Sequence, residues 1–351
     1  MKKFMLFAVA FAVLAGTLAF YGCGSKSTTG PTPAAAVIKD PSVWTQVTQT
    51  TPFTATDWNT TYVYNNKMWV VAGRKSGGAT IAEVWNSANG ADWTMVTGNA
   101  AFGPRFRHAG VVFNNKMWVM AGTPLSGNCA TPINDVWYSS NGADWTLATG
   151  NAQFAPRFNP RAFNFNGKMW IAGGIDDTCG YLNDVWSSTN GVTWTKVTAT
   201  AAFSPRHTFG VTVCNNKMWI IGGYDNQPGK NYYGQFYSGE DNDVWSSGNG
   251  VDWASVTGNA GFSPRTGLTV FSDGSRLYAG MGYDDNISGN LNDDLWYSTD
   301  GKLWTLATQA LTGAGRMRAD AIVYNGKVWI IGGSTCSSSS TCVTNEVWSS
   351  H

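Results

Sequence analysis

Short apolar segments alternate with polar turns along most of the chain, and the alternation repeats. The most regular segment is an apolar strand opened by a lysine or arginine, and it occurs six times. Successive opening bases lie 49, 52, 49, 59 and 51 residues apart. They are Lys67, Lys116, Lys168, Lys217, Arg276 and Lys327. A period near 50 residues excludes the shorter tetratricopeptide, ankyrin and leucine-rich repeats and predicts a repeated unit of several strands.

Each repeat contains three further segments that predict strands. One precedes the opening base and is joined to it by Asn-Asn or Asn-Gly, which favours a tight hairpin turn. The others carry an acid-x-Trp motif and a Trp-Thr-x-Val-Thr-like motif, and Asn-Gly or Asp-Gly separates them. No stretch has the length and period of a helix. Each repeat is therefore predicted to be four antiparallel strands, which we name A to D in chain order.

The two ends of the repeating region complement each other. It begins with a D-type strand at Trp44 and stops at His351, just after a C-type strand. If the first strand supplies the missing one, six blades close into a ring without a free sheet edge. We therefore predict an all-β fold over residues 41–351: a six-bladed β-propeller of four-stranded antiparallel blades, closed by its N-terminal strand.

Several motifs of these blades resemble the kelch and galactose oxidase central-domain superfamily. They are the acid-x-Trp of strand C, the Trp of strand D, a Pro-Arg before strand A, and a double glycine that closes strand B at residues 173–174, 222–223 and 332–333. The resemblance covers residues 41–351. It implies the same propeller fold and leaves the ligand open, because one fold serves many functions.

The first 40 residues differ from the repeats. Lys2 and Lys3 precede an uncharged apolar run, and Cys23 stands where that run ends, before a Ser-, Thr- and Pro-rich stretch. This resembles a bacterial lipoprotein signal, in which the cysteine becomes the lipidated first residue. An ordinarily cleaved secretory signal is the alternative. We expect a signal peptide at residues 1–22 and a flexible linker at 23–40.

The same segment predicts where the protein works. We expect it in the bacterial cell envelope, exported and held by its N-terminal lipid in the outer membrane or at the cell surface. Without lipidation it would be periplasmic or secreted. No second apolar run is long enough to span a bilayer, so the lipid is the expected membrane contact.

The net charge and the positions of the tryptophans limit the kinds of partner that the protein is expected to bind. The chain has 23 Lys and Arg against 22 Asp and Glu, so its net charge of +1 gives no electrostatic case for nucleic acid. Of its 18 tryptophans, 17 fall into the registers of strands B, C and D, where they predict packing between blades, and Trp58 is the remainder. We expect a monomer that binds a glycan or a surface protein.

The connections between strands indicate which face binds. Hairpins A–B and C–D are short and share one end of every blade, whereas the variable B–C and D–A connections share the other. The B–C connection of the fourth repeat is the longest and carries Tyr232 and Tyr233. Long loops in compact domains are commonly functional. We therefore expect the ligand on the B–C and D–A face.

One arginine recurs on that face, 11 residues before the opening base, in five repeats. The five are Arg105, Arg157, Arg206, Arg265 and Arg316, and Thr56 takes the position in the first repeat. A carboxylate recurs in all six repeats before strand C. These arginines could hold an anionic ligand bidentately, or each could pair with a carboxylate and fix a loop. We favour the structural role, because a blade has sixfold symmetry and a ligand rarely does.

Residues that break the repeat on this face are better candidates for ligand contact. They are Trp58, Arg107, His108, Asn159, Arg161, His207, Arg318 and Asp320, together with Tyr232 and Tyr233 of the long loop. Together they predict a polar, partly basic mouth with one aromatic platform, which suits sugars and peptides. The alternative for any single one of these residues is that it varies as an ordinary surface position and contacts no ligand.

A binding module is favoured over an enzyme, and no catalytic residue is assigned. The chain has no Gly-rich phosphate loop and no serine nucleophile elbow. A copper oxidase site is not supported, because the internal histidines His108 and His207 do not share a repeat register. The chain also resembles the six-bladed kelch-type sialic acid epimerases of the bacterial periplasm. A sugar epimerase or mutarotase is therefore the alternative, with Arg107, Arg161 and Arg318 among the residues of matching type.

The cysteines predict two disulfides if the protein is exported. Cys336 and Cys342 lie in one loop, and Cys129 and Cys179 lie in the B–C loops of adjacent blades. Cys214 aligns with large apolar residues at the end of strand A and is expected to be a small buried hydrophobe.

No cofactor is expected. Asp284, Asn286 and Ser288 have oxygen ligands at alternate positions with a glycine at the sixth, as calcium loops do. The closing glutamate at the twelfth position is replaced by Leu295. A polar B–C turn is therefore favoured over a calcium site.

Overall fold

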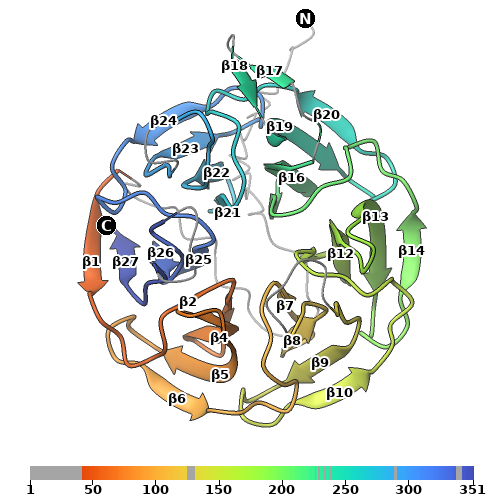
Figure 1. Ribbon diagram of the computed structural model, residues 1–351, viewed down its shortest axis with the longest axis vertical. Coiled ribbons are helices and arrows are strands. Elements are labelled where there is room, and N and C mark those ends of the chain that lie inside the picture. Colours follow the sequence, from red (N-terminus) through yellow and green to blue (C-terminus); the bar gives the residue numbers. More distant parts are fainter. Residues whose placement is uncertain are drawn as a thin grey trace, which may run out of the picture.

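The computed structural model describes residues 42–351, except 125–130, 226, 228–229, 233–234, 238, 288–290 and 337–341. The described residues form six antiparallel sheets around a central axis and contain no helix (Figure 1). This confirms the predicted all-β six-bladed propeller. The segments predicted as signal peptide and linker lie outside the described residues.

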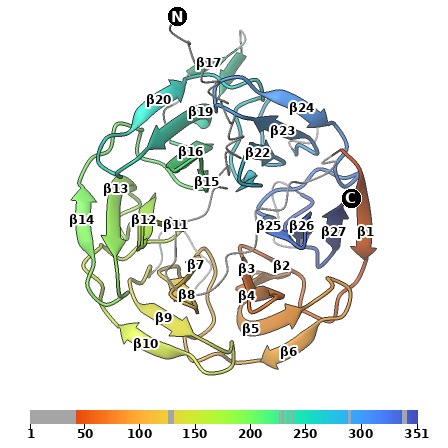
Figure 2. The same cartoon turned by 180° about the vertical axis from the view of Figure 1, so that it is seen from behind.

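The strands follow each other from the axis to the rim of each blade, and Figure 2 shows the innermost ones. Blade one has β2 (Thr56–Asp57), β3 (Thr60–Tyr64), β4 (Lys67–Lys75), β5 (Thr80–Ser87) and β6 (Thr94–Thr97). Blade two has β7 (Ala109–Phe113), β8 (Lys116–Met120), β9 (Val136–Ser139) and β10 (Thr146–Thr149). Blade three has β11 (Arg161–Phe165), β12 (Lys168–Ile175), β13 (Tyr181–Ser188) and β14 (Thr195–Thr198).

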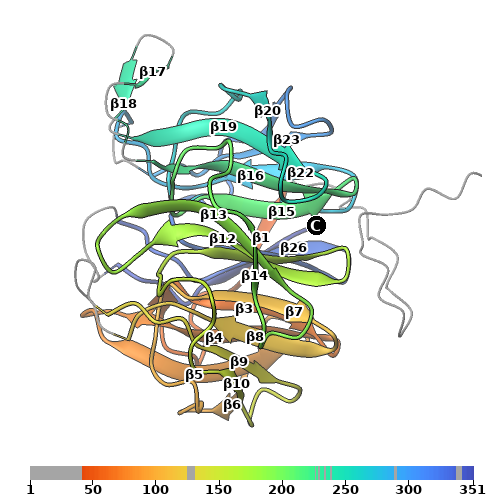
Figure 3. The same cartoon turned by 90° about the vertical axis from the view of Figure 1, so that its right-hand side faces the viewer.

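The remaining blades repeat the pattern. Blade four has β15 (Gly210–Cys214), β16 (Lys217–Tyr224), β19 (Glu240–Ser247) and β20 (Ala254–Thr257). Its long B–C connection contains β17 (Lys230–Tyr232) and β18 (Gln235–Tyr237), a hairpin that stands out from the disc in the edge-on view of Figure 3. Blade five has β21 (Thr269–Ser272), β22 (Leu277–Gly280), β23 (Leu295–Ser298) and β24 (Thr305–Thr308). Blade six has β25 (Asp320–Tyr324), β26 (Lys327–Ile331), β27 (Val347–Ser350) and β1 (Trp44–Thr48).

The ring is closed by the two ends of the described chain. Strand β1 pairs antiparallel with β27, with Trp44 opposite Ser350 and Gln46 opposite Trp348. The sixth sheet therefore has the order β1-β27-β26-β25, and its outer strand comes from the start of the repeats (Figure 1). This confirms the predicted closure, which leaves β27 with a partner on both sides.

The core lies between blades, because each sheet buries its faces against its neighbours. One apolar cluster joins Trp118 and Met120 of blade two to Met169 and Ile171 of blade three, and equivalent clusters follow around the ring. Five strand D tryptophans pack edge-on against a phenylalanine of the preceding D–A connection, as Trp145 does on Phe102 at 4.8 Å between ring centroids. The regular tryptophans thus hold the blades together.

The cysteines agree with part of the prediction. Cys336 and Cys342 form a disulfide with 5.6 Å between their Cα atoms, as expected. Cys179 is disulfide-bonded, and its predicted partner Cys129 lies outside the described residues. Cys214 is fully buried in the cluster between blades four and five. Within the described ranges, the chain contains no helix long and apolar enough to cross a bilayer.

Candidate functional site

The five arginines in register are buried and paired within their own blades. Arg157 donates hydrogen bonds to both carboxylate oxygens of Asp184 at 2.6 and 2.9 Å, and a third to the carbonyl oxygen of Gly173 at 3.1 Å. The other ion pairs are Arg105–Asp135, Arg206–Asp243, Arg265–Asp294 and Arg316–Glu346. Each guanidinium is occupied by its own blade, which favours the structural role over ligand binding.

Two positions beyond that register, the backbone is left-handed in every blade. The six residues, with their φ angles, are Trp58 (59°), Arg107 (57°), Asn159 (56°), Thr208 (56°), Gly267 (65°) and Arg318 (60°). We call them the mouth ring. Hydrogen bonds link equivalent backbone groups across blades: the amides of Asn159, Gly267 and Arg318 donate to the carbonyl oxygens of Arg107, Thr208 and Gly267, at 2.8, 3.0 and 2.9 Å.

The mouth ring is strained at its Trp, Arg and Thr members, because glycine and, to a lesser extent, asparagine tolerate left-handed backbone. A side chain in left-handed backbone costs about 1–2 kcal/mol per residue, because Cβ crowds the following carbonyl oxygen. Such strain persists only where the surroundings impose it, and it clusters at functional sites. The blades therefore hold these side chains in directions that they would not adopt on their own.

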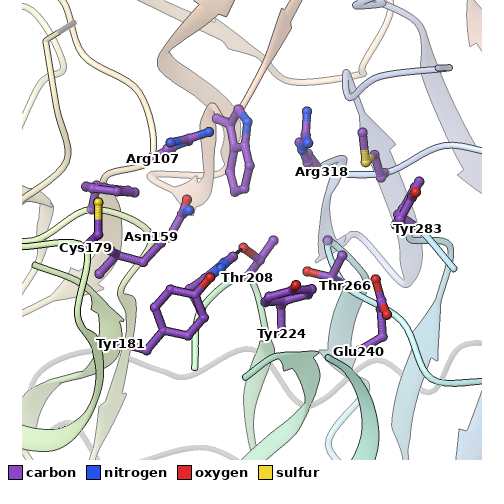
Figure 4. A pocket seen from close by; sticks show the side chains of 16 residues that line it. Arg107, Asn159, Cys179, Tyr181, Thr208, Tyr224, Glu240, Thr266, Tyr283 and Arg318 are labelled. Carbon is purple, nitrogen blue, oxygen red and sulfur yellow. Dashed lines mark hydrogen bonds between the residues drawn. The ribbon is translucent and has the colours of Figure 1, made fainter. Parts of the chain in front are cut away.

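All six members of the mouth ring line one cavity of about 610 Å³. We call it the mouth cavity (Figure 4). Five predicted candidates line it: Trp58, Arg107, Asn159, His207 and Arg318. B–C connections and strand ends supply further lining residues, including Tyr181, Tyr224, Glu240, Thr266 and Tyr283. The volume lies in the range of small-molecule sites.

One wall of the mouth cavity is cationic. The guanidinium carbons of Arg107 and Arg318 lie 5.3 and 4.9 Å from the centre of the Trp58 ring. Arg318 also contacts Asp57, with 3.3 Å from its Nη1 to the carboxylate Oδ2. Burial lowers the pKa of Arg107 to about 10, and the positive charges of Arg318 and Arg74 act in the same direction, against the charge of Asp57. Arg107 still carries its charge at neutral pH.

The opposite wall is aromatic and also carries the carboxylate of Glu240. The His207 ring lies 4.7 Å from that of Tyr181, edge to face, and 5.4 Å from that of Tyr224. Its Nδ1 shares a hydrogen bond with the hydroxyl of Thr208. Burial lowers the pKa of His207 to about 3, with help from the charges of Arg107 and Arg318, so the imidazole is uncharged at neutral pH.

Several buried polar atoms at the mouth cavity have no hydrogen-bond partner among the described residues. They are Trp58 Nε1, Arg107 Nε, Asn159 Oδ1 and Thr266 Oγ1. Buried polar groups in folded proteins are nearly always satisfied, so each unpaired one calls for an explanation. A ligand that offers both donors and acceptors would match the chemistry of these groups.

The other predicted candidates lie deeper. His108, Arg161 and Asp320 line a second cavity of about 180 Å³ in the central channel, between the innermost strands. Asp320 accepts hydrogen bonds from the Thr61 amide and hydroxyl at 2.7 and 3.0 Å, and burial raises its pKa. Arg161 Nε donates to the carbonyl oxygen of Phe209 at 2.7 Å. The candidates expected to form one mouth are therefore divided between two cavities.

Two expectations fall wholly or partly outside the described residues. Tyr233 and the side chain of Tyr232 are among the parts left undescribed. In the calcium candidate, Ser288 is also undescribed, while Asp284 Oδ1 accepts a hydrogen bond from the amide of Asn286 at 2.8 Å. Over the described ranges, no group of three or more His, Cys, Asp or Glu side chains is arranged to hold a metal ion.

Sequence reasoning missed the aromatic wall. Tyr224 and Tyr283 each follow directly after the glycine that closes strand B, the position held by Ile175 in blade three, and all three line the mouth cavity. This register varies from blade to blade, as the mouth ring does. A search for residues that differ between blades at the position after the closing glycine of strand B would have found Tyr224 and Tyr283.

Comparison with known proteins supports the fold and leaves the ligand open. Residues 110–239 match the family model of the DUF6242 beta propeller domain. No curated protein matches the chain. The fold and this match define a β-propeller, a class that serves as a binding or scaffold module.

Proposed function

We propose that this propeller is a binding module that takes a carbohydrate in the mouth cavity. The observation that carries the proposal is the pairing of two surfaces in one cavity of about 610 Å³. Tyr181 and Tyr224 offer aromatic surface for the apolar face of a sugar ring. Trp58 Nε1, Asn159 Oδ1 and Thr266 Oγ1 offer unpaired donors and acceptors for its hydroxyl groups.

We further propose that the propeller is of the kelch type and works in the bacterial cell envelope. The basic start, the apolar run and Cys23 support export and lipid attachment. Labelling of cells with a radioactive fatty acid tests this. Label that disappears in Cys23→Ser supports the anchor, and an unlabelled but exported protein supports an ordinarily cleaved signal.

A glycan array probed with the mature chain tests the carbohydrate assignment. On any glycan that binds, Tyr181→Ala and Asn159→Ala are expected to weaken binding at least about tenfold, the loss of one well-placed contact. Leu303→Ala is the matched control, since Leu303 is 74% exposed on a C–D hairpin at the other end of the blades. Binding to no glycan, or binding unaffected by both variants, would remove the assignment.

A sugar epimerase or mutarotase is the second candidate. Tyr181, His207 and Glu240 line the same cavity, and their polar atoms are of the type that transfers protons. The bound glycan should then be followed by NMR for anomer exchange or epimerisation. Acceleration that is lost in Arg107→Gln favours the enzyme, and binding without turnover favours the module.

A further inference from the structure

Three arginines meet beside the mouth cavity, and one carboxylate serves two of them. Asp57 is fully buried and accepts hydrogen bonds from Arg74 Nε at 3.0 Å and Arg74 Nη2 at 2.6 Å. The same Oδ2 atom lies 3.3 Å from Arg318 Nη1. Both oxygens of Asp57 are thus engaged, which leaves this carboxylate little capacity for a further guanidinium.

The third arginine, Arg107, forms no ion pair with any described residue. Its guanidinium carbon lies 5.3, 4.9 and 5.3 Å from the ring centres of Trp58, Phe106 and Phe158. Its Nε is buried without a hydrogen-bond partner among these residues. Aromatic faces attract a guanidinium but accept no hydrogen bond of ordinary strength, so its donors remain available.

Arg107 therefore lacks an ion-pair partner among the described residues. Arg74 and Arg318 share Asp57, and the Glu240 carboxylate lies across the mouth cavity from Arg107 (Figure 4). A poorly solvated charge without an ion-pair partner is costly, and a bound monoanion would supply one.

We propose that Arg107 binds the carboxylate of an acidic sugar beside Trp58, with the charge of Arg318, whose guanidinium lies near the same indole, adding to the attraction. This rests on the proposed function and specifies its ligand class. A carboxylate offers two oxygens with lone pairs in one plane, which match the forked donors of a guanidinium. The Trp58 Nε1–H, also without a partner among the described residues, is a further donor at the same wall. The sugar ring then faces Tyr181 and Tyr224 across the cavity.

Titrations of the mature chain with paired sugars test this. The probes are galacturonate against galactose, glucuronate against glucose, and galactose 6-phosphate, followed by calorimetry. The uronates are expected to bind at least about tenfold tighter than their neutral partners. Their affinity should fall when salt rises from about 50 to about 500 mM, because screening weakens the ion pairs. This salt dependence needs no variant, so it holds even if a substitution impairs folding.

Variants locate the carboxylate. Arg107→Gln and Arg318→Gln should each weaken uronate binding at least about tenfold more than they weaken binding of the matching neutral sugar. Arg107→Lys keeps the positive charge but loses the forked pair of donors. Its affinity for uronates should lie between those of the unaltered chain and Arg107→Gln. Lys302→Gln is the matched control, because it removes one charge from an exposed position on a C–D hairpin.

The outcomes separate the two proposals. Neutral sugars that bind as well as uronates overturn the carboxylate site and leave the carbohydrate assignment standing. Uronate binding that is unchanged in both arginine variants overturns the location, and a preference for galactose 6-phosphate overturns the carboxylate class. If acetate or succinate binds and none of the sugars does, the carbohydrate assignment is overturned and the carboxylate site stands. No binding of any probe by the folded chain overturns both.

Discussion

Gly142 of blade two lies directly against the indole of Trp69 in blade one. A Cβ atom at position 142 would stand 2.3 Å from Cζ3 of Trp69, well inside van der Waals contact. The same approach recurs around the ring, between Gly191 and Trp118, Gly250 and Trp170, Gly301 and Trp219, and Gly90 and Trp329. Each C–D hairpin therefore closes on the strand B tryptophan of the preceding blade.

Gly142→Ala should destabilise the protein more than alanine does at glycines that have open space around them. The residue has φ of 78°, so alanine adds backbone strain to the steric clash. We expect a loss of about 2–4 kcal/mol in the free energy of unfolding, from overpacking and strain together. Urea unfolding followed by tryptophan fluorescence measures it.

Two matched alanine variants separate the clash from the strain. Gly103 has φ of 77°, and a Cβ atom placed there would meet no other atom within 4 Å, so Gly103→Ala should cost only about 1 kcal/mol. Gly248 has equal space and no positive φ, so Gly248→Ala should change stability by less than about 0.5 kcal/mol. If Gly142→Ala costs no more than Gly103→Ala, the indole contact does not hold the blades together.

The sequence predicts the blades much better than the contacts between them. The spacing of Trp69, Trp118 and their equivalents is enough to count blades, because the period of a repeat is a local property. The Asn-Gly pairs predict tight turns from local turn chemistry. Gly142 also packs against Trp69, about 70 positions earlier in the chain. This contact depends on how neighbouring blades are arranged around the axis, and no local sequence pattern contains that information.

The pair of Arg157 and Asp184 stabilises the fold. Both side chains are largely buried, with exposed fractions of 0 and 14%. Arg157→Met should cost about 3–5 kcal/mol, since it leaves a buried carboxylate without its counter-charge. Arg157→Met/Asp184→Leu should recover most of that loss, because an apolar pair replaces an ionic one. A double-mutant cycle in urea measures the coupling, and a single-variant loss below about 1 kcal/mol would contradict a structural role.

The same pair predicts an acid-dependent loss of stability. Burial alone would raise the pKa of Asp184, but hydrogen bonds and charge from Arg157, with a hydrogen bond from Trp186, lower it below its ordinary value. A carboxyl whose folded pKa is depressed stabilises the fold above its unfolded pKa, and this is lost as pH falls through the folded pKa. The melting temperature should therefore decrease as the pH is lowered below about 4.

Arg157→Met is the control for that pH dependence. Without the guanidinium, burial dominates and the pKa of Asp184 should rise above its unfolded value. The stability deficit of the variant should then shrink as the pH falls, because protonation removes the unpaired charge. A deficit that is the same at pH 7 and pH 4 would show that Asp184 does not carry the effect.

The division of the candidates between two cavities could not be predicted from register alone. Arg107 and His108 are adjacent in sequence, yet Arg107 lines the mouth cavity and His108 lines the deeper one. The reason is the start of β7 at Ala109, where the chain passes from a left-handed turn into a strand that lines the channel. Side-chain direction changes sharply at such a junction, and only the backbone angles reveal where it falls.

The disulfides should differ in what they contribute. Peptide mapping without reductant is expected to recover Cys129 linked to Cys179, and free thiols at both would contradict the bridge between blades. Cys129→Ser should lower stability by about 4 kcal/mol, because the bridge would close a loop of about 50 residues. Cys336→Ser opens a loop of sequence separation 6 and should cost about 2 kcal/mol. Equal losses would argue against the loop-entropy account.

Trp58 is the tryptophan outside the three strand registers, and it contacts both arginines of the mouth cavity. Trp58→Ala removes the surface on which those guanidiniums rest, so binding of an array-identified glycan should fall at least about tenfold. Trp58→Phe keeps a smaller aromatic face and loses the Nε1–H, so binding should weaken about threefold to tenfold. The backbone strain at φ of 59° is the same for all three side chains, so stability should change through packing alone. Circular dichroism melts confirm that each variant is folded before calorimetry is compared. If folded Trp58→Ala binds the glycan as tightly as the unaltered chain, the ligand meets another part of the propeller.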